Sequence, residues 1–116
     1  MAVEAPPVGE LPVAPVPWLS LLIPAYDFPA GVDRILDSVA AAADERIECL
    51  VGDDSTTPEV ERRVRAHAAF ASGRVAYVRN VPARGAVTNW NEMITRASGE
   101  YLLFMHHDEC PAGSEW

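Results

Sequence analysis

Residues 47–60 read IECLVGDDSTTPEV, and they carry the clearest structural signal in the chain. The first part is an almost continuously apolar run, which is typical of a strand buried on both faces of a parallel sheet. The run stops abruptly at Asp53 and Asp54. A helix start follows, because Thr57 suits the N-cap position and Pro58 suits the first helical position. The stretch therefore predicts a buried strand that ends in two carboxylates and leads into a helix.

The same unit recurs on either side of this stretch. Short apolar runs predict strands, and apolar residues at helical spacing between them predict helices. The predicted strands span residues 18–24, 47–54, 75–80 and 100–107, and the predicted helices span residues 28–44, 57–71 and 86–98. Pro24 is expected to end the first strand, and Gly99 to stop the third helix. The order β-α-β-α-β-α-β indicates an α/β fold with a parallel sheet and helices on both faces.

Apolar spacing also predicts which residues each helix buries. The expected inward residues are Val32, Ile35, Leu36, Val39 and Ala43 in the first helix, Val60, Val64 and Ala68 in the second, and Val87, Trp90, Ile94 and Ala97 in the third. The spacing of Trp90 favours a core residue over a side chain that stacks on a ligand. His67 is expected at the surface or at the core boundary, and Cys49 is expected to be a small buried apolar residue.

The charge balance excludes several classes of function. The chain has 116 residues and a formal net charge of -8, and its nine basic residues are all arginine. An acidic chain without a basic cluster is a poor binder of nucleic acid and of anionic membranes. The absence of lysine excludes a Schiff base and a phosphate-loop lysine. We therefore expect no nucleic-acid partner.

The length of the chain predicts one small domain that follows an N-terminal leader. Residues 1–17 are rich in Pro, Val and Ala without periodicity, which predicts a flexible leader that is either a passive tail or a Pro-rich ligand. Residues 18–116 form the predicted domain. No apolar run approaches the roughly 20 residues of a membrane span. Cys49 and Cys110 make no disulfide framework, which favours a reducing, cytoplasmic location.

Four polar segments are expected at one edge of the sheet, because the carboxyl ends of parallel strands meet there and bind ligands. They are residues 25–27, 53–55, 80–85 and 106–109. The preference of turns for Asp and Ser explains one or two such strand ends. It explains less well two acidic clusters on one edge, since unpaired carboxylates brought together need a cation or a hydrogen-bonding ligand.

Five motifs along the chain resemble those of the family 2 glycosyltransferases. The motifs are PAYD (24–27), GDDST (52–56), RNVPARG (79–85), NWN (89–91) and SGEYLLFMHHDE (98–109). The family pattern has a strand ending Pro-x-Tyr-Asn, another ending Asp-Asp-x-Ser, then Asn-x-Gly, a helix asparagine, and a strand ending Asp-x-Asp. The resemblance covers residues 18–112 and implies the Rossmann-like GT-A fold, of which this chain would be the nucleotide-binding half, truncated relative to the family.

The resemblance implies a site for the nucleotide of a nucleotide-diphospho-sugar. The residues it assigns to that site are Pro24, Ala25, Tyr26, Asp27, Asp54, Arg84 and His107. Tyr26 would pack by the base, Asp54 would accept a hydrogen bond from a base N–H, and His107 would lie near the ribose. Asp53 is expected to cap the following loop instead. Asn91 matches the family's helix asparagine and would steady the donor-site loops.

The resemblance also implies a Mn²⁺ or Mg²⁺ ion that bridges the two phosphates. Asp108 is its expected ligand, and His106, which replaces the first Asp of the family motif, is either a second ligand or a support for Asp108. Arg84 either contacts the phosphates or is a solvated loop residue. A zinc site in the run His106–Cys110 is disfavoured, because adjacent residues on a strand point to opposite faces.

The expected function is metal-dependent transfer of a sugar from a nucleotide-diphospho-sugar to an acceptor hydroxyl, with a UDP-sugar as the expected donor. The alternative is a non-catalytic nucleotide- or metal-binding module, or a degenerate fragment of such an enzyme. The family takes its catalytic base from the second half of the fold, and no residue here is assigned to that role. The acceptor and the sugar are unassigned as well. A four-stranded sheet with an uncovered edge and face predicts marginal stability or an oligomer.

Overall fold

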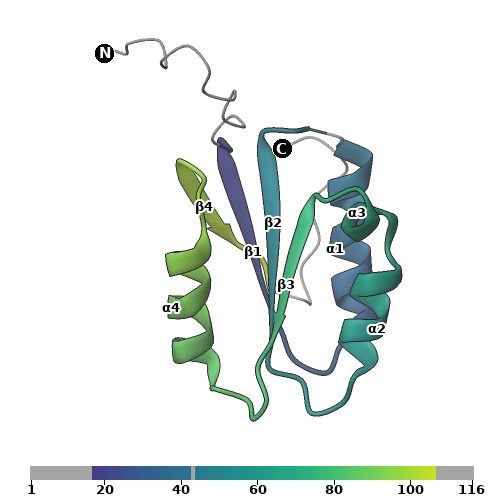
Figure 1. The fold of residues 1–116 in the computed structure, drawn as a ribbon, viewed down its shortest axis with the longest axis vertical. Helices are drawn as coiled ribbons and strands as arrows, with labels where there is room; N and C mark the ends of the chain where they lie inside the picture. Colours follow the sequence, from purple (N-terminus) through teal and green to yellow (C-terminus); the bar gives the residue numbers. More distant parts are fainter. Residues whose placement is uncertain (1–16, 43, 107–116) are drawn as a thin grey trace, which may run out of the picture.

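The computed structural model describes residues 17–42 and 44–106 as a parallel sheet with helices on both faces (Figure 1). The strands are β1 (Leu19–Ala25), β2 (Ile47–Asp53), β3 (Val75–Arg79) and β4 (Tyr101–Phe104), and the helices are α1 (Pro29–Ala42), α2 (Glu59–Ala66), α3 (Ala68–Ala71) and α4 (Ala86–Arg96). The strand order is β3-β2-β1-β4, and every neighbouring pair is parallel. The predicted α/β fold is confirmed. The residues of the predicted leader lie outside the described part, apart from Pro17.

The two central strands are apolar because both of their faces are covered. Side chains alternate between the faces of a strand, so Leu21 and Ile23 of β1 face the α1 side while Leu22 faces α4. Helices α1, α2 and α3 cover the first face, and α4 covers the second (Figure 1). The predicted inward residues of α1 from Val32 to Val39 are all buried. Cys49 is buried too, and burial raises the pKa of its thiol to about 12.

Pro24 does not end the first strand as predicted; it lies inside β1, opposite Gly52 of β2. The carbonyl of Leu22 faces β4, where it accepts from Met105 N, and the carbonyl of Ala25 faces β2, where it accepts from Asp54 N. By alternation the missing N–H of Pro24 faces the β4 side. Pairing with β4 ends at Leu22, so no ladder hydrogen bond is lost there.

The second predicted helix is broken into two pieces at His67, whose backbone is extended. The ring Nδ1 of His67 accepts a hydrogen bond from Ala69 N and so caps α3. The break shifts the helical phase, so that Ala69 is buried and the predicted Ala68 is exposed. Pro58 and not Thr57 occupies the N-cap position of α2, but Glu59 N, at the start of the helix, donates a long hydrogen bond of 3.5 Å to Thr57 Oγ1.

Helix α4 buries a face that overlaps the predicted one only in part: Trp90 and Ala97 pack against the second core cluster as predicted, but Val87 and Ile94 do not. Val87 is 68% exposed and Ile94 is 41% exposed, whereas Asn89 and Met93 are buried. The helix packs on β2 at Gly52, where an added Cβ would lie 2.6 Å from Asn89 Oδ1 and 2.8 Å from Met93 Sδ. The absence of a side chain at Gly52 thus lets Asn89 and Met93 approach the sheet, and Val87 turns outward.

The edge strand β4 is short, and Tyr101, Leu102 and Leu103 are exposed on it. This apolar edge supports the predicted marginal stability or oligomerisation, which stays a prediction. Within the described residues, no helix has the length and apolarity that a membrane crossing needs.

Candidate functional site

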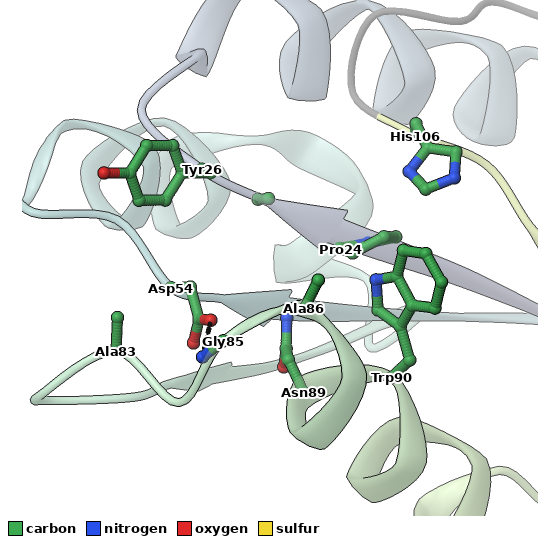
Figure 2. A pocket seen from close by; sticks show the side chains of 10 residues that line it. Pro24, Tyr26, Asp54, Ala83, Gly85, Ala86, Asn89, Trp90 and His106 are labelled. Carbon is green, nitrogen blue, oxygen red and sulfur yellow. Dashed lines mark hydrogen bonds between the residues drawn. The ribbon is translucent and has the colours of Figure 1, made fainter.

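A pocket of about 310 Å³ lies at the carboxyl edge of the sheet, where the sequence predicted a site (Figure 2). It is bounded by the ends of β1 and β2, the loop before α4, the first turns of α4, and His106 after β4. Its lining residues are Pro24, Ala25, Tyr26, Asp54, Ala83, Gly85, Ala86, Asn89, Trp90 and His106. Figure 2 shows Tyr26 and Ala83 toward one end and Trp90 and His106 toward the other, with Asp54 between the β2 end and the loop.

Asp54 is almost fully buried, with 6% of the residue exposed, and three donors bind its carboxylate. Oδ1 accepts from Asn80 Nδ2 at 2.8 Å and from Arg84 N at 3.1 Å, and Oδ2 accepts from Gly85 N at 2.8 Å. An ionised carboxylate offers about four lone-pair positions. Three are therefore filled by described residues, and one on Oδ2 is left without a donor among them.

The loop before α4 is shaped to deliver these amides. Gly85 stands at the N-cap of α4 with φ +89°, a left-handed conformation that glycine adopts without steric penalty. Its N–H points to Asp54 while its carbonyl accepts from Asn89 N. Asn80 N donates to the carbonyl of Asp53, which fixes the start of the loop on β2.

Asp53 has a structural role, as predicted. It is fully buried; its Oδ1 accepts from Ser55 N at 2.9 Å, and its Oδ2 accepts from the hydroxyl of Tyr77 at 2.5 Å. Asp53 does not line the pocket. The two adjacent carboxylates thus point to opposite faces of the sheet: Asp53 binds Ser55 and Tyr77, whereas Asp54 lines the pocket.

Asp27 turns its side chain away from the pocket. Its backbone lies at φ +51°, and its carboxylate accepts from both Thr56 N and Thr56 Oγ1. The hydrogen bond from the Thr56 side chain lowers the pKa of Asp27. Asp27 N donates to Ser55 Oγ, so this turn ties the end of β1 to the loop after β2.

An aromatic group forms the other end of the pocket. The Trp90 ring lies 5.6 Å from the ring of Phe104 and 5.4 Å from that of His106, measured between ring centroids. Trp90 is half-buried and reaches the second core cluster. It therefore belongs partly to the predicted core and also lines the pocket.

Comparison with protein families identifies the family of the chain. The sequence model of glycosyl transferase family 2 matches residues 20–116, which is most of the chain. The chain belongs to glycosyl transferase family 2. The resemblance drawn from the sequence motifs is thus confirmed.

Relatives of this family 2 domain are much longer than it is. An uncharacterized glycosyltransferase of Haemophilus influenzae is 28% identical over 92 residues, a match that covers 79% of this chain and 30% of that protein. The chain therefore spans about a third of the length of that relative.

Solved structures share the GT-A-type fold. The mannosyltransferase PcManGT from Pyrobaculum calidifontis, in complex with GDP-Man and Mn²⁺, superposes with a TM-score of 0.75 at 20% identity, covering 84% of this chain and 29% of that one. Residues 1–349 of S. aureus TarS, in complex with UDP, superpose with a TM-score of 0.70 at 21% identity, over the same shares of the two chains. The predicted GT-A half-fold is confirmed.

Some of the site residues predicted from the family 2 motifs line the pocket, and others do not. Pro24, Ala25, Tyr26, Asp54 and His106 line it. Asp27 and the Arg84 side chain do not, because Asp27 binds Thr56 and the Arg84 guanidinium pairs with Glu92 of α4. His107, Asp108, Glu109 and Cys110 lie outside the described residues.

Of the two helix asparagines, Asn89 is the one that contacts the loop before α4, and not Asn91 as expected. Asn91 is exposed on α4, whereas Asn89 is 4% exposed and accepts a hydrogen bond from Asn80, at the start of the loop before α4. Ala83 and Gly85 belong to the segment 80–85 that was expected at this edge, although neither was named as a site residue, and Ala86 was not predicted there. The NWN motif indicated that a helix asparagine contributes to the site. Which of its two asparagines faces the sheet could not be predicted, because that depends on the close approach of α4 to Gly52.

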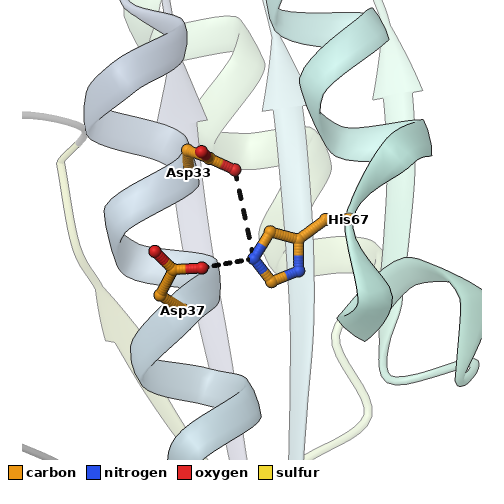
Figure 3. Close-up of side chains that lie close together, drawn as sticks. All are labelled: Asp33, Asp37 and His67. Atoms are coloured by element: carbon orange, nitrogen blue, oxygen red, sulfur yellow. Dashed lines mark hydrogen bonds and ion pairs between the residues drawn. The ribbon is translucent and has the colours of Figure 1, made fainter.

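A second polar cluster lies away from the pocket, between α1 and the α2–α3 break (Figure 3). His67 Nε2 lies 2.7 Å from Asp37 Oδ1 and 4.0 Å from Asp33 Oδ1, and Arg63 pairs with Asp33. Because His67 Nδ1 accepts from Ala69 N, the neutral ring carries its proton on Nε2. That proton points at Asp37, so the cluster is a hydrogen-bonded clamp rather than a ready metal site.

Proposed function

We propose that this chain binds a UDP-sugar and forms the donor-binding part of a metal-dependent glycosyltransferase. The observation that carries the proposal is the placement of Asp54 at the pocket with one acceptor position left. A carboxylate accepts hydrogen bonds and cannot donate them, so it selects a base that presents an N–H. Uracil presents one imide N–H, whereas guanine presents two adjacent donors and cytosine presents an acceptor at the same ring position.

Tyr26 supports the base site. Its ring and Asp54 both line the pocket, and so do Pro24 and Ala25, which precede it at the end of β1. An aromatic ring beside a carboxylate gives a base both a stacking surface and an acceptor. His107 by the ribose remains part of the proposal.

A divalent cation belongs to the proposal because a pyrophosphate is anionic, and the described residues that line the pocket include Asp54 but no arginine. His106 lines the pocket two residues before Asp108, and an imidazole with a carboxylate fits Mn²⁺ better than Mg²⁺. When bound, the ion would neutralise the diphosphate and stabilise it as the leaving group. Arg84 is paired with Glu92, so its contact with phosphate would require that pair to open.

A non-catalytic nucleotide-binding module is the second candidate. The chain spans about 30% of the length of the relatives it matches, and no described residue is assigned as a catalytic base. The cysteine content supports the proposed cytoplasmic location. The acceptor and the transferred sugar stay unassigned.

The test is calorimetric titration of the chain with UDP, CDP and GDP, each with Mn²⁺ and with EDTA. We expect UDP to bind best, and only weakly without the metal. Asp108→Ala should abolish the difference between Mn²⁺ and EDTA, while Asp44→Ala, just before β2 at the edge opposite the pocket, should leave it unchanged. Binding followed by donor hydrolysis or transfer supports the enzyme, and binding without turnover supports the module. Failure of UDP to bind in Mn²⁺ would overturn both.

A further inference from the structure

Behind the pocket, a line of buried polar groups joins β2 to α4 and returns to Asp54. Asn80 Nδ2 donates to Asp54 Oδ1 at 2.8 Å and to Asn89 Oδ1 at 3.0 Å. Asn89 Nδ2 then donates to the carbonyl of Gly52 at 3.0 Å. Asn80 is 5% exposed and Asn89 is 4% exposed, so water competes little with these bonds.

The direction of every bond in this line is fixed by its two ends. The Gly52 carbonyl and the Asp54 carboxylate can only accept. Asn80 must therefore present its NH₂ group to Asp54, and its second hydrogen then reaches Asn89 Oδ1. Asn89 in turn must present its NH₂ group to Gly52. Only this orientation of the two side-chain amides gives every donor in the line an acceptor.

We infer that Asn89, acting through Asn80, is a positioning residue that sets how Asp54 reads the base. The inference rests on the proposed function. Asn80 fills one lone pair of Asp54 Oδ1, and the Arg84 and Gly85 amides fill two more. With those three fixed, the remaining position has one direction and accepts one N–H. If Asn80 is released, Oδ1 regains a free position and the carboxylate can rotate toward other donors.

Asn89 rather than Asn91 has this role because of the close approach at Gly52. Both asparagines stand on α4 two residues apart, but only Asn89 faces β2. The pair therefore provides a matched comparison: the same substitution on the same helix, once in the line and once on the exposed surface.

The test compares Asn89→Ala and Asn91→Ala in the full 116-residue chain with two readouts. Amide hydrogen exchange at Arg84 and Gly85 reports the hold of Asp54 on the loop without any ligand. The ratio of UDP to CDP affinity, in Mn²⁺ and below the melting temperature of each variant, reports base reading. We expect Asn89→Ala to speed exchange at both amides and to lower the ratio by about tenfold, the size of one hydrogen bond to a charged group. Asn91→Ala should change neither.

The outcomes separate this inference from the proposed function. Faster exchange with a lowered ratio supports it, whereas an equal loss of UDP and CDP affinity indicates a merely structural role and overturns it. Unchanged exchange in Asn89→Ala overturns it whatever the chain binds. Faster exchange in a chain that binds no UDP overturns both the proposed function and the inference that Asn89 affects recognition of the base. It would then show only that Asn89 holds Asp54 on the loop before α4. Should Asn89→Ala not fold, Asn80→Ala cuts the same line next to Asp54 and is judged by the same outcomes.

Discussion

The hydroxyl of Tyr77 on β3 donates a 2.5 Å hydrogen bond to Oδ2 of the fully buried Asp53 on β2. Desolvation, and then this bond, raise the pKa of Tyr77, so its hydroxyl keeps its proton at neutral pH. We expect Tyr77→Phe to lower the free energy of unfolding by about 1–3 kcal/mol, because a buried carboxylate oxygen loses its donor. Urea unfolding followed by circular dichroism measures the change.

Tyr101→Phe is the control for that substitution. Tyr101 is 59% exposed on β4, and removal of its hydroxyl should change the unfolding free energy by less than about 0.5 kcal/mol. Equal losses in the two variants would contradict the role assigned to the Tyr77–Asp53 bond.

Glu48 pins the turn before β4 to the two central strands, at the edge opposite the pocket. Its carboxylate accepts from Ser20 Oγ, Ser98 N and Ser98 Oγ. Burial acts to raise the pKa of Glu48, but these hydrogen bonds outweigh it and the pKa is lowered. A lowered pKa in the folded state means that the stabilisation is present above the unfolded value and is lost as the pH falls through the folded value.

We therefore expect acid to weaken the wild type more than Glu48→Gln below about pH 4.5, the ordinary glutamate range. At pH 7 the variant should be less stable by about 1 kcal/mol, since solvent screening limits the effect at a partly exposed site. Thermal melts from pH 7 to pH 3 measure both. Glu45→Gln, at an exposed position nearby, should follow the wild-type curve. Parallel curves for the wild type and Glu48→Gln would show that Glu48 does not contribute to acid sensitivity.

His67 combines two roles that a pair of substitutions separates. Its Nδ1 caps α3 and its Nε2 binds Asp37 on α1. His67→Ala removes both and should cost about 1–2 kcal/mol of unfolding free energy, whereas His67→Asn retains a good N-cap and should cost about half as much. Asp37→Asn, at a largely exposed side chain, should cost less than about 1 kcal/mol. If His67→Asn were as damaging as His67→Ala, the cap would not be the main contribution.

The architecture could be predicted from the sequence because its signals are local. Two-sided burial makes β1 and β2 read as apolar runs, and the polar ends of those runs mark the site edge, so Asp54 was predicted there. The donors to Asp54 could not be predicted, since Arg84 and Gly85 act through backbone amides some thirty residues away.

The face of α4 could not be predicted for a related reason. Val87 and Ile94 have the spacing of a buried face, and a buried asparagine contradicts apolar periodicity. Asn89 is buried because Asn80 and the Gly52 carbonyl satisfy its amide, and both partners lie on other elements. At the break, His67 likewise contacts Asp37 on another helix, which lies 30 residues away in the sequence.

The close approach at Gly52 gives a final prediction that joins β2 to α4. A methyl group at Gly52 would lie 2.6 Å from Asn89 Oδ1 and 2.8 Å from Met93 Sδ. Gly52→Ala should therefore lower the unfolding free energy by about 1–3 kcal/mol through overpacking. The flexible Met93 side chain can move away, but Asn89 is held by two hydrogen bonds and cannot.

A double-mutant cycle distinguishes which neighbour opposes the methyl group. In an Asn89→Ala background, Gly52→Ala should be less harmful, with a coupling of about 0.5–2 kcal/mol between the two sites. Met93→Leu serves as the matched background in which Asn89 is retained, and there the full loss should persist. Additive losses at Gly52 and Asn89, measured by urea unfolding, would mean that α4 shifts as a whole and that the Asn89 contact does not set its distance from the sheet.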